Sequence, residues 1–244
     1  MLTYMDDIII HSRDLEEGMA KLKTVLTTAG DYGLNVNWEK CRFLERRIEY
    51  LGHIVEKGCV RPSERKTTAV VNFPVPVCTK QVQSFLGLSG YFRKFIPQYS
   101  MIARPLSNLL KDGVTFHFGD EQKDAFQRLK VILSGDPVLK LYRIGVETEL
   151  HTDASSQGYG AILFQKDSED QRLHPVYYAS WKTTDAESRY ASYELEVLAI
   201  VKSLSKFRVY LLGIPFKIVT DCQAFSLTMS KKIYACELPG GHSC

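Results

Sequence analysis

The alternation of hydrophobic and polar positions predicts short strands and one helix near the start of the chain. Apolar residues recur at steps of three and four over residues 14–33, which predicts an amphipathic helix. Before it, apolar runs on either side of two aspartates, residues 6–7, predict two strands around a tight turn. Residues 41–55 have a strand-like pattern, with Gly52 and Gly58 as turn or bulge signals.

The middle of the chain has the pattern of a helical unit. Residues 73–76, Phe-Pro-Val-Pro, form a stiff extended break. Helices are predicted over residues 79–88, with the threonine at position 79 as cap, then over about 91–99, ending near Pro97, and over 101–110. A further amphipathic helix is predicted over residues 121–133.

The last third of the chain changes to strand periodicity. Strands are predicted over residues 146–152, 159–165 and 175–180, a long helix over about 186–210, and a last strand over 216–220. The order β-β-β-α-β belongs to a mixed sheet with helices packed on it.

Charge is distributed unevenly along the chain. The formal net charge of 244 residues is only +3, yet residues 65–111 contain seven Lys or Arg and no Asp or Glu. The rest of the chain then carries 24 basic and 28 acidic residues. The basic stretch is either a solvated face or a surface that follows phosphates.

Composition excludes several classes of protein. With 45% hydrophobic and 24% charged residues the chain is globular rather than disordered, and no apolar run approaches the ~18 residues of a membrane span. Scattered cysteines without C-x-x-C pairs argue against a structural zinc site and favour a reducing intracellular compartment. They stand at positions 41, 59, 78, 222, 236 and 244.

Three carboxylates of the last third are candidates for chemistry. Asp153 ends the first predicted strand and Asp221 the last, so both project toward one region of a sheet. Glu196 lies at the border of the buried helix face, which is predicted to consist of Val197, Ile200, Val201, Leu204 and Phe207. Either Asp alone is more simply a turn cap, but three convergent acids suit two divalent ions and in-line phosphoryl displacement.

The residues around these acids resemble the ribonuclease H domain of gypsy-type long-terminal-repeat retrotransposons. The resemblance rests on Thr152-Asp153-Ala154-Ser155, on residues 193–200 and on Val219-Thr220-Asp221. Earlier segments are similar to the same family's polymerase. They are Tyr4-Met5-Asp6-Asp7 (Y-x-D-D), residues 37–43 (N-x-x-K-C-x-F), Tyr50-Leu51-Gly52-His53 (primer grip) and residues 84–96 (thumb signature).

The resemblance implies roles for individual residues. Asp6 and Asp7 would be catalytic in the polymerase palm, with Asp6 as a metal ligand, and Asp153, Glu196 and Asp221 would bind metal in the nuclease. Leu51, Gly52 and His53 would position the primer terminus, while Lys80, Arg93, Lys94 and Arg104 of the thumb would grip the nucleic-acid backbone. Tyr91, Phe92, Phe95 and Tyr99 would touch sugars or bases, or form the helix core.

The fold class implied is α+β: the C-terminal part of a polymerase palm plus a helical thumb, then an incomplete ribonuclease H-like mixed β-sheet with helices. The segments expected are palm 1–62, thumb 63–112, connecting segment with helix 113–145, ribonuclease H-like domain 146–232, and a non-matching tail 233–244. The tail is expected to be disordered and to arise from a frame shift or a mispredicted exon.

The implied function is RNA-directed DNA polymerisation with hydrolysis of RNA in RNA–DNA hybrids. Mg²⁺, or Mn²⁺ in its place, is the implied cofactor, and the partners are an RNA–DNA hybrid and a template–primer duplex, without a membrane. An earlier palm aspartate and the fingers would lie upstream of Met1, so we expect the chain by itself to lack polymerase activity. The alternatives are a non-catalytic nucleic-acid-binding remnant and an inert pseudogene product. The expected location is the cytoplasm, a virus-like particle or the nucleus, and some members of the family form homodimers.

Overall fold

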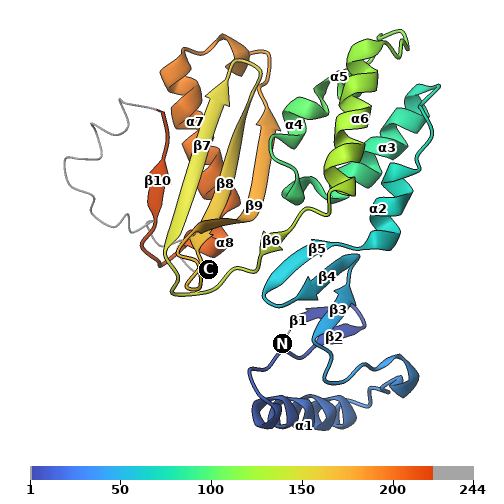
Figure 1. Ribbon diagram of the computed structural model, residues 1–244, viewed down its shortest axis with the longest axis vertical. Coiled ribbons are helices and arrows are strands. Elements are labelled where there is room, and N and C mark those ends of the chain that lie inside the picture. Colours follow the sequence, from blue (N-terminus) through green and yellow to red (C-terminus); the bar gives the residue numbers. More distant parts are fainter. Residues whose placement is uncertain (1, 222–244) are drawn as a thin grey trace, which may run out of the picture. The chain divides into compact units, whose positions relative to one another are not determined.

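The computed structural model describes residues 2–221 of the chain (Figure 1). It divides into two compact units, one ending at Glu45 and one starting at Arg46. The tail predicted to be disordered, residues 233–244, lies outside the described residues. No helix within the described part is long and apolar enough to span a membrane.

The first unit is a hairpin followed by a helix. Strands β1 (Leu2–Tyr4) and β2 (Asp7–Ile9) pair antiparallel, with Tyr4 opposite Asp7. Helix α1 (Leu15–Asp31) begins as predicted, because the Asp14 carboxylate accepts the backbone N–H of Glu17 at 2.8 Å. A short 3-10 turn, η1 (Trp38–Lys40), follows.

The second unit opens with a four-stranded antiparallel sheet in the order β3-β4-β5-β6. Its strands are β3 (Arg47–Tyr50), β4 (His53–Glu56), β5 (Cys59–Pro62) and β6 (Leu139–Lys140). Leu51-Gly52 and Lys57-Gly58 form two-residue turns in which every residue has a positive φ, between 48° and 70°. Positive φ at both positions is typical of type I′ hairpins, and this explains both glycines. The pattern of the sequence did not predict β6.

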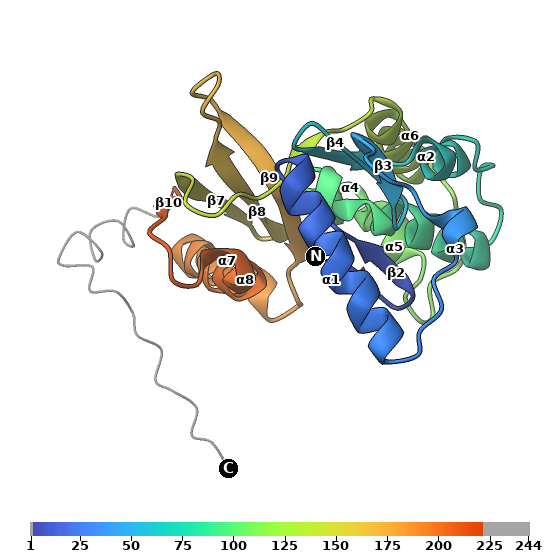
Figure 2. The same cartoon turned by 90° about the horizontal axis from the view of Figure 1, so that it is seen from below.

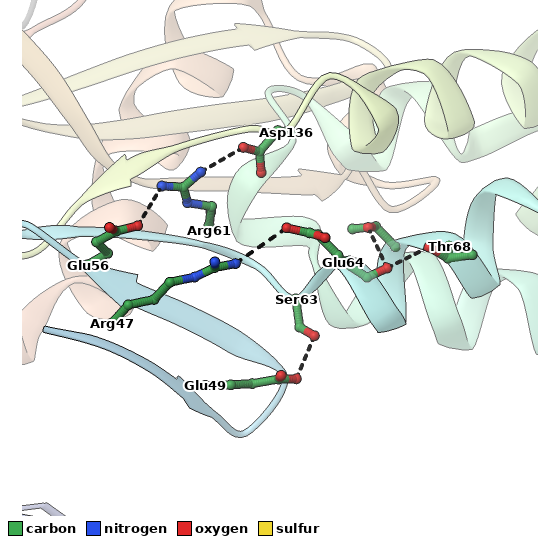
Figure 3. A network of polar contacts seen from close by, with 9 residues as sticks. Arg47, Glu49, Glu56, Arg61, Ser63, Glu64, Thr68 and Asp136 are labelled. Atoms are coloured by element: carbon green, nitrogen blue, oxygen red, sulfur yellow. Dashed lines mark hydrogen bonds and ion pairs between the residues drawn. The ribbon is translucent and has the colours of Figure 1, made fainter. Parts of the chain in front are cut away.

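Polar contacts join this sheet to its surroundings (Figure 3). The Arg61 guanidinium donates to Glu56 at 3.1 Å on its own sheet and to Asp136 at 3.0 Å, in the segment between α6 and β6. Ser63 Oγ donates to the Glu49 carboxylate at 2.5 Å. The connecting segment is therefore tied to the sheet by side chains as well as by β6.

Helices follow the sheet and share one core. They are α2 (Glu64–Val71), α3 (Thr79–Tyr91), the 3-10 turn η2 (Arg93–Phe95), α4 (Tyr99–Ile102), α5 (Arg104–Asn108) and α6 (Asp120–Ser134). Their apolar side chains pack together with Val60 and Leu139 of the sheet. Helix α2 was not predicted, and Thr79 is the first helical residue rather than the cap, which is Cys78.

The continuous helices predicted over residues 91–99 and 101–110 are wrong. Pro97 lacks an N–H donor, and Gln98 adopts a left-handed conformation with φ of 49°, so the chain turns between η2 and α4. A second interruption at Ala103 separates α4 from α5, and Pro105 lies in the first turn of α5.

The last part of the second unit is a mixed sheet in the order β10-β7-β8-β9. Its strands are β7 (Thr148–Ser155), β8 (Gly158–Lys166), β9 (Leu173–Lys182) and β10 (Lys217–Val219). Strand β10 is parallel to β7, and the other pairs are antiparallel, so the predicted β-β-β-α-β mixed sheet is confirmed. Helices α7 (Ser192–Lys206) and α8 (Arg208–Leu211), which follow the 3-10 turn η3 (Glu187–Arg189), lie on one face of it (Figure 2).

The buried face of α7 differs from the predicted one. Val197 and Val201 are 36% and 56% exposed, whereas the buried residues are Leu195, Glu196, Ala199, Ile200 and Ser203. The prediction followed the largest aliphatic side chains. Ile200 and Phe207 are buried as predicted, and the buried face also contains Glu196, Ala199 and Ser203, small or polar residues that let the helix approach the sheet closely.

Candidate active site and nucleic-acid interface

Asp153 lies within β7, two residues before its end, and Asp221 lies two residues beyond the end of β10, the parallel neighbour of β7. Val219 of β10 lies opposite His151 of β7, and continuing this register by two residues places Asp221 opposite Asp153. Both aspartates are exposed. The two carboxylates, 68 positions apart in the sequence, both act electrostatically on Glu196, although neither is the last residue of its strand as expected.

Glu196 is the third carboxylate of this site and is almost completely buried. It is 7% exposed on α7, which packs on β7. Its carboxylate accepts the backbone N–H of Ala154 and, at 3.4 Å, the hydroxyl of Thr220. These two donors come from the segments that carry Asp153 and Asp221, so they hold Glu196 toward them.

The electrostatics of Glu196 show that the three acids share one environment. Burial raises the pKa of Glu196, and the negative charge of Asp153 and, to a smaller extent, of Asp221 raises it further. The two hydrogen bonds to its ionised form act in the opposite direction. Across residues 2–221, no group of three or more His, Cys, Asp or Glu side chains is arranged so that it could hold a metal ion.

Asp6 and Asp7 lie in the first unit at the tip of the β1–β2 hairpin. Asp6 belongs to its two-residue turn and Asp7 starts β2, and both are exposed. Met5, the other turn residue, has a φ of 52°, which is costly for a side chain other than glycine. The turn therefore holds two acids at the end of a hairpin in a strained backbone.

A second set of predicted residues gathers where the β3–β4 turn meets the helices. The Tyr91 ring stacks on His53 with centroids 5.4 Å apart, and its hydroxyl donates to the carbonyl of Leu51. The Lys66 ammonium lies 4.4 Å from the centre of the Tyr91 ring. A Cβ at Gly52 would come within 2.7 Å of the Lys66 side chain, so the glycine allows this close approach.

His53 is neutral at this turn. Burial, together with the positive charges of Lys94 and Lys66, lowers its pKa to about 4. Its Nδ1 is buried and receives no hydrogen bond from the part of the chain that the structure describes. The pKa of Lys94 is also lowered by burial, and its ammonium lies 5.1 Å from the Phe95 ring centre. We call the set Leu51, Gly52, His53, Lys66, Tyr91 and Lys94 the turn–thumb cluster.

The structure places the other thumb residues elsewhere. Lys80 is exposed on α3. The Arg93 guanidinium donates to the Ser180 carbonyl of β9 at 2.6 Å, so it joins the helices to the mixed sheet. Arg104 lines a cavity beside the end of β9.

The aromatic residues of the thumb separate into two kinds. Phe92 and Phe95 are 1% exposed and Tyr99 is 8% exposed, so for these three the core alternative is confirmed. Tyr91 is 44% exposed and presents its ring at the turn–thumb cluster. Lys66 was missed as a site residue, although the acid-free basic stretch contains it.

Two family matches cover most of this architecture. Residues 118–218 match the RNase H-like domain found in reverse transcriptase, and residues 1–55 match reverse transcriptase, an RNA-dependent DNA polymerase. The chain is related to reverse transcriptases and carries a ribonuclease H-like domain.

Its curated relatives are retrotransposon polyproteins. Over 226 residues it is 39% identical to the retrovirus-related Pol polyprotein from transposon 297 of Drosophila melanogaster, covering 91% of this chain and 20% of that protein. Over 224 residues it is 38% identical to the transposon Tf2-3 polyprotein of Schizosaccharomyces pombe, covering 91% of this chain and 17% of that protein. The chain thus spans a fifth or less of the length of these two relatives.

Solved structures show the same fold. A foamy viral protease-reverse transcriptase in complex with RNA/DNA hybrid has a TM-score of 0.73 and 21% identity, covering 85% of this chain and 28% of that one. The same kind of protein in complex with dsDNA has a TM-score of 0.73 and 20% identity, covering 89% of this chain and 45% of that one. The predicted α+β fold is confirmed.

Proposed function

We propose that Asp153, Glu196 and Asp221 form a ribonuclease H site that hydrolyses the RNA strand of an RNA–DNA hybrid. The observation that carries the proposal is the position of Glu196. It is buried between two exposed acids whose charges raise its pKa, while two hydrogen bonds hold its ionised form. A cation between the three would relieve that repulsion.

The donor set fits hard divalent cations, because all three side chains supply carboxylate oxygens. Mg²⁺, or Mn²⁺ in its place, would activate the attacking water and neutralise the charge that develops on the phosphate. The chain's own residues orient the site. Ala154 N–H and the Thr220 hydroxyl keep the Glu196 carboxylate directed at the sheet edge. The substrate's 2′-hydroxyl would distinguish RNA from DNA.

We also infer that the turn–thumb cluster contacts the backbone of a template–primer duplex or of the hybrid. Lys66 and Lys94 supply positive charge, and Tyr91 presents an exposed ring. Lys80, exposed near the start of α3, is proposed as a separate backbone contact. The foamy viral relatives of this fold are described in complex with RNA/DNA hybrid and with dsDNA, which supports a nucleic-acid partner.

For the polymerase we propose Asp6 and Asp7 as catalytic acids, with Asp6 as a metal ligand, because they lie at an exposed hairpin tip in the segment that matches reverse transcriptase. DNA synthesis is proposed for the polyprotein to which such a segment belongs. The division into palm (1–62), thumb (63–112), connecting segment (113–145) and ribonuclease H-like domain (146–232) stays a prediction, as do a homodimer and the location in cytoplasm, virus-like particle or nucleus.

A cleavage assay with the full chain tests the nuclease. An RNA–DNA hybrid labelled on the RNA strand is incubated with Mg²⁺ and with wild type, Asp153→Asn or Glu169→Gln. Glu169 is an exposed acid of the β8–β9 turn and serves as the matched control. We expect cleavage by wild type and the control, and none by Asp153→Asn.

Equal cleavage by wild type and Asp153→Asn would reject the metal-site assignment. Binding of the hybrid by wild type that weakens steeply with salt, without any cleavage, would instead identify a non-catalytic nucleic-acid-binding protein.

A further inference from the structure

A cavity of about 350 Å³ lies between the helices and the end of the mixed sheet, and none of the three carboxylates lines it. Helix α5 and the turn after it provide one wall, and the β7–β8 turn and the residues around the end of β9 provide the other. Its lining residues are Arg104, Asn108, Lys111, Gln157, Lys182, Thr183, Thr184 and Asp185. None of them is aromatic or aliphatic, so the cavity suits a polar ligand rather than a base or an apolar group.

The lining carries three cations and one acid. Burial lowers the pKa of Lys182, and the nearby positive charges of Lys111 and Arg104 lower it further. None of these three cations lies within 4.0 Å of a carboxylate among the described residues. Asp185 offsets one of the three positive charges, so the lining keeps an excess of positive charge in a partly closed space.

Arg104, one of the lining residues, also carries a buried donor that lacks an acceptor within the described part of the chain. Nη1 of Arg104 is buried, and no described residue accepts a hydrogen bond from it. A buried guanidinium nitrogen without a partner costs free energy. It is the charge of the guanidinium, and not this buried nitrogen, that would attract a phosphate. Lys182 Nζ donates to Ser107 Oγ, which fixes the lysine beside α5.

The other wall is held in place by its own hydrogen bonds. Thr183 Oγ1 donates to the Ser156 carbonyl at 2.8 Å, and Thr184 N–H donates to the Glu187 carboxylate at 2.8 Å. The two walls are joined through Ser100 N–H, which donates to Ser180 Oγ at 2.9 Å. The positive groups are thus carried on an ordered framework before any ligand binds.

We propose that this cavity binds a phosphate group. A phosphate offers several acceptor oxygens and a negative charge to the Arg104 fork, Lys111 and Lys182. Its source is either a phosphodiester of the nucleic acid that the protein binds or free phosphate. Only the first source rests on the function proposed above. Such a contact would hold one strand at the junction of the helices and the ribonuclease H-like domain.

The first arm of the test uses inorganic phosphate as the probe. Amide chemical shifts of the ¹⁵N-labelled full chain are followed during a titration against sodium chloride at equal ionic strength. We expect saturable shifts at residues 104–111 and 182–185, with binding weakened about tenfold in Arg104→Gln. Lys111→Gln, at an exposed position, should weaken binding in the same direction and serves if Arg104→Gln does not fold.

Arg128→Gln is the matched control, because Arg128 is an exposed arginine of α6 with its side chain 61% accessible. Shifts that do not saturate, or that are equal in Arg104→Gln, Lys111→Gln and Arg128→Gln, would overturn the proposal.

The second arm distinguishes the two sources. Binding of an RNA–DNA hybrid is measured at several salt concentrations. If the phosphate belongs to a strand, Arg104→Gln reduces the slope of log affinity against log salt by about 0.9, the value for one lost contact, and Arg128→Gln does not. An unchanged slope together with saturable phosphate binding supports the cavity as a free-phosphate site. Failure of the nuclease proposal can be told apart from failure of the phosphate-site proposal, because the phosphate titration requires neither cleavage nor Asp153.

Discussion

Ser180→Ala should destabilise the second unit through a single buried hydrogen bond. Ser100 is the second residue of α4, a position at which a backbone N–H has no acceptor within its own helix. Ser180 Oγ of β9 accepts this N–H at 2.9 Å and donates to Ser100 Oγ at 3.1 Å. Ser100 and Ser180 are 7% and 2% exposed, so water cannot easily replace the lost acceptor.

The expected magnitude follows from which atom loses its partner. Ser180→Ala leaves the buried N–H of Ser100 unsatisfied, which costs about 1–3 kcal/mol. A loss of about 2 kcal/mol lowers the folding equilibrium constant about thirtyfold. Ser100→Ala keeps the N–H bond to Ser180 Oγ, and the Ser180 carbonyl still accepts from Arg93 at 2.6 Å. It should therefore cost only about 1 kcal/mol.

Urea unfolding followed by circular dichroism measures both variants. Ser168→Ala, at an exposed position in the β8–β9 turn, is the control and should change stability by less than about 0.5 kcal/mol. The reasoning is refuted if Ser180→Ala costs no more than this control, or if Ser100→Ala costs as much as Ser180→Ala. The first result would mean that water or a backbone shift satisfies the N–H of Ser100.

Three further predictions concern the candidate sites. The folded-state pKa of Glu196 is raised, so its contribution to stability is present at low pH and is lost as pH rises through that pKa. In metal-free buffer at pH 7, Glu196→Gln should therefore unfold at a higher temperature than wild type. Added Mg²⁺ should raise the melting temperature of wild type but not of Glu196→Gln, and equal shifts would argue against a metal site there. The pKa of His53 is lowered from 6.5 to about 4, so the free energy of unfolding should fall by up to about 3 kcal/mol between pH 6.5 and pH 4. The fall should be smaller in His53→Phe, and urea unfolding at several pH values measures both proteins. Gly52→Ala places a Cβ against Lys66 at a φ of +69° and should weaken duplex binding. The control Gly145→Ala, with a φ of +82° and open space around it, should cost about 1–2 kcal/mol of stability without changing binding. Equal duplex binding by both variants would contradict a role of Lys66 at this turn.

Local signals predicted the elements whose residues contact mainly their sequence neighbours. Helix α1 follows from its spacing and from the Asp14 cap, and strands β7 to β9 follow from alternation and turn residues. The break near Pro97 was predicted, but the short η2 turn before it and the interruption at Ala103 between α4 and α5 were missed. Strand β6 was missed because its partner, β5, lies almost 80 residues earlier and two residues carry too little pattern.

Sequence motifs could name the candidate acids, but not how each acid is held. Asp153, Glu196 and Asp221 were predicted from strand ends and a helix, yet the burial of Glu196 depends on which face of α7 meets β7. Arg93 and Lys94 are neighbours in the sequence, but Arg93 bonds to β9 and Lys94 lies at the turn–thumb cluster. The two side chains leave the short 3-10 turn η2 in different directions. A hydrophobic pattern along the sequence does not encode which direction each side chain takes.

The sequence by itself determined the first hairpin and helix, the β-β-β-α-β order of the mixed sheet, the acid-free basic stretch and the candidate acids. These depend on residue type and short spacing. Only the tertiary structure decided which basic residues face solvent and which face the protein. Lys182, outside the basic stretch, joins Arg104 and Lys111 at one cavity because β9 ends beside α5. Such a juxtaposition arises from the packing of distant segments, which a pattern along the chain does not contain.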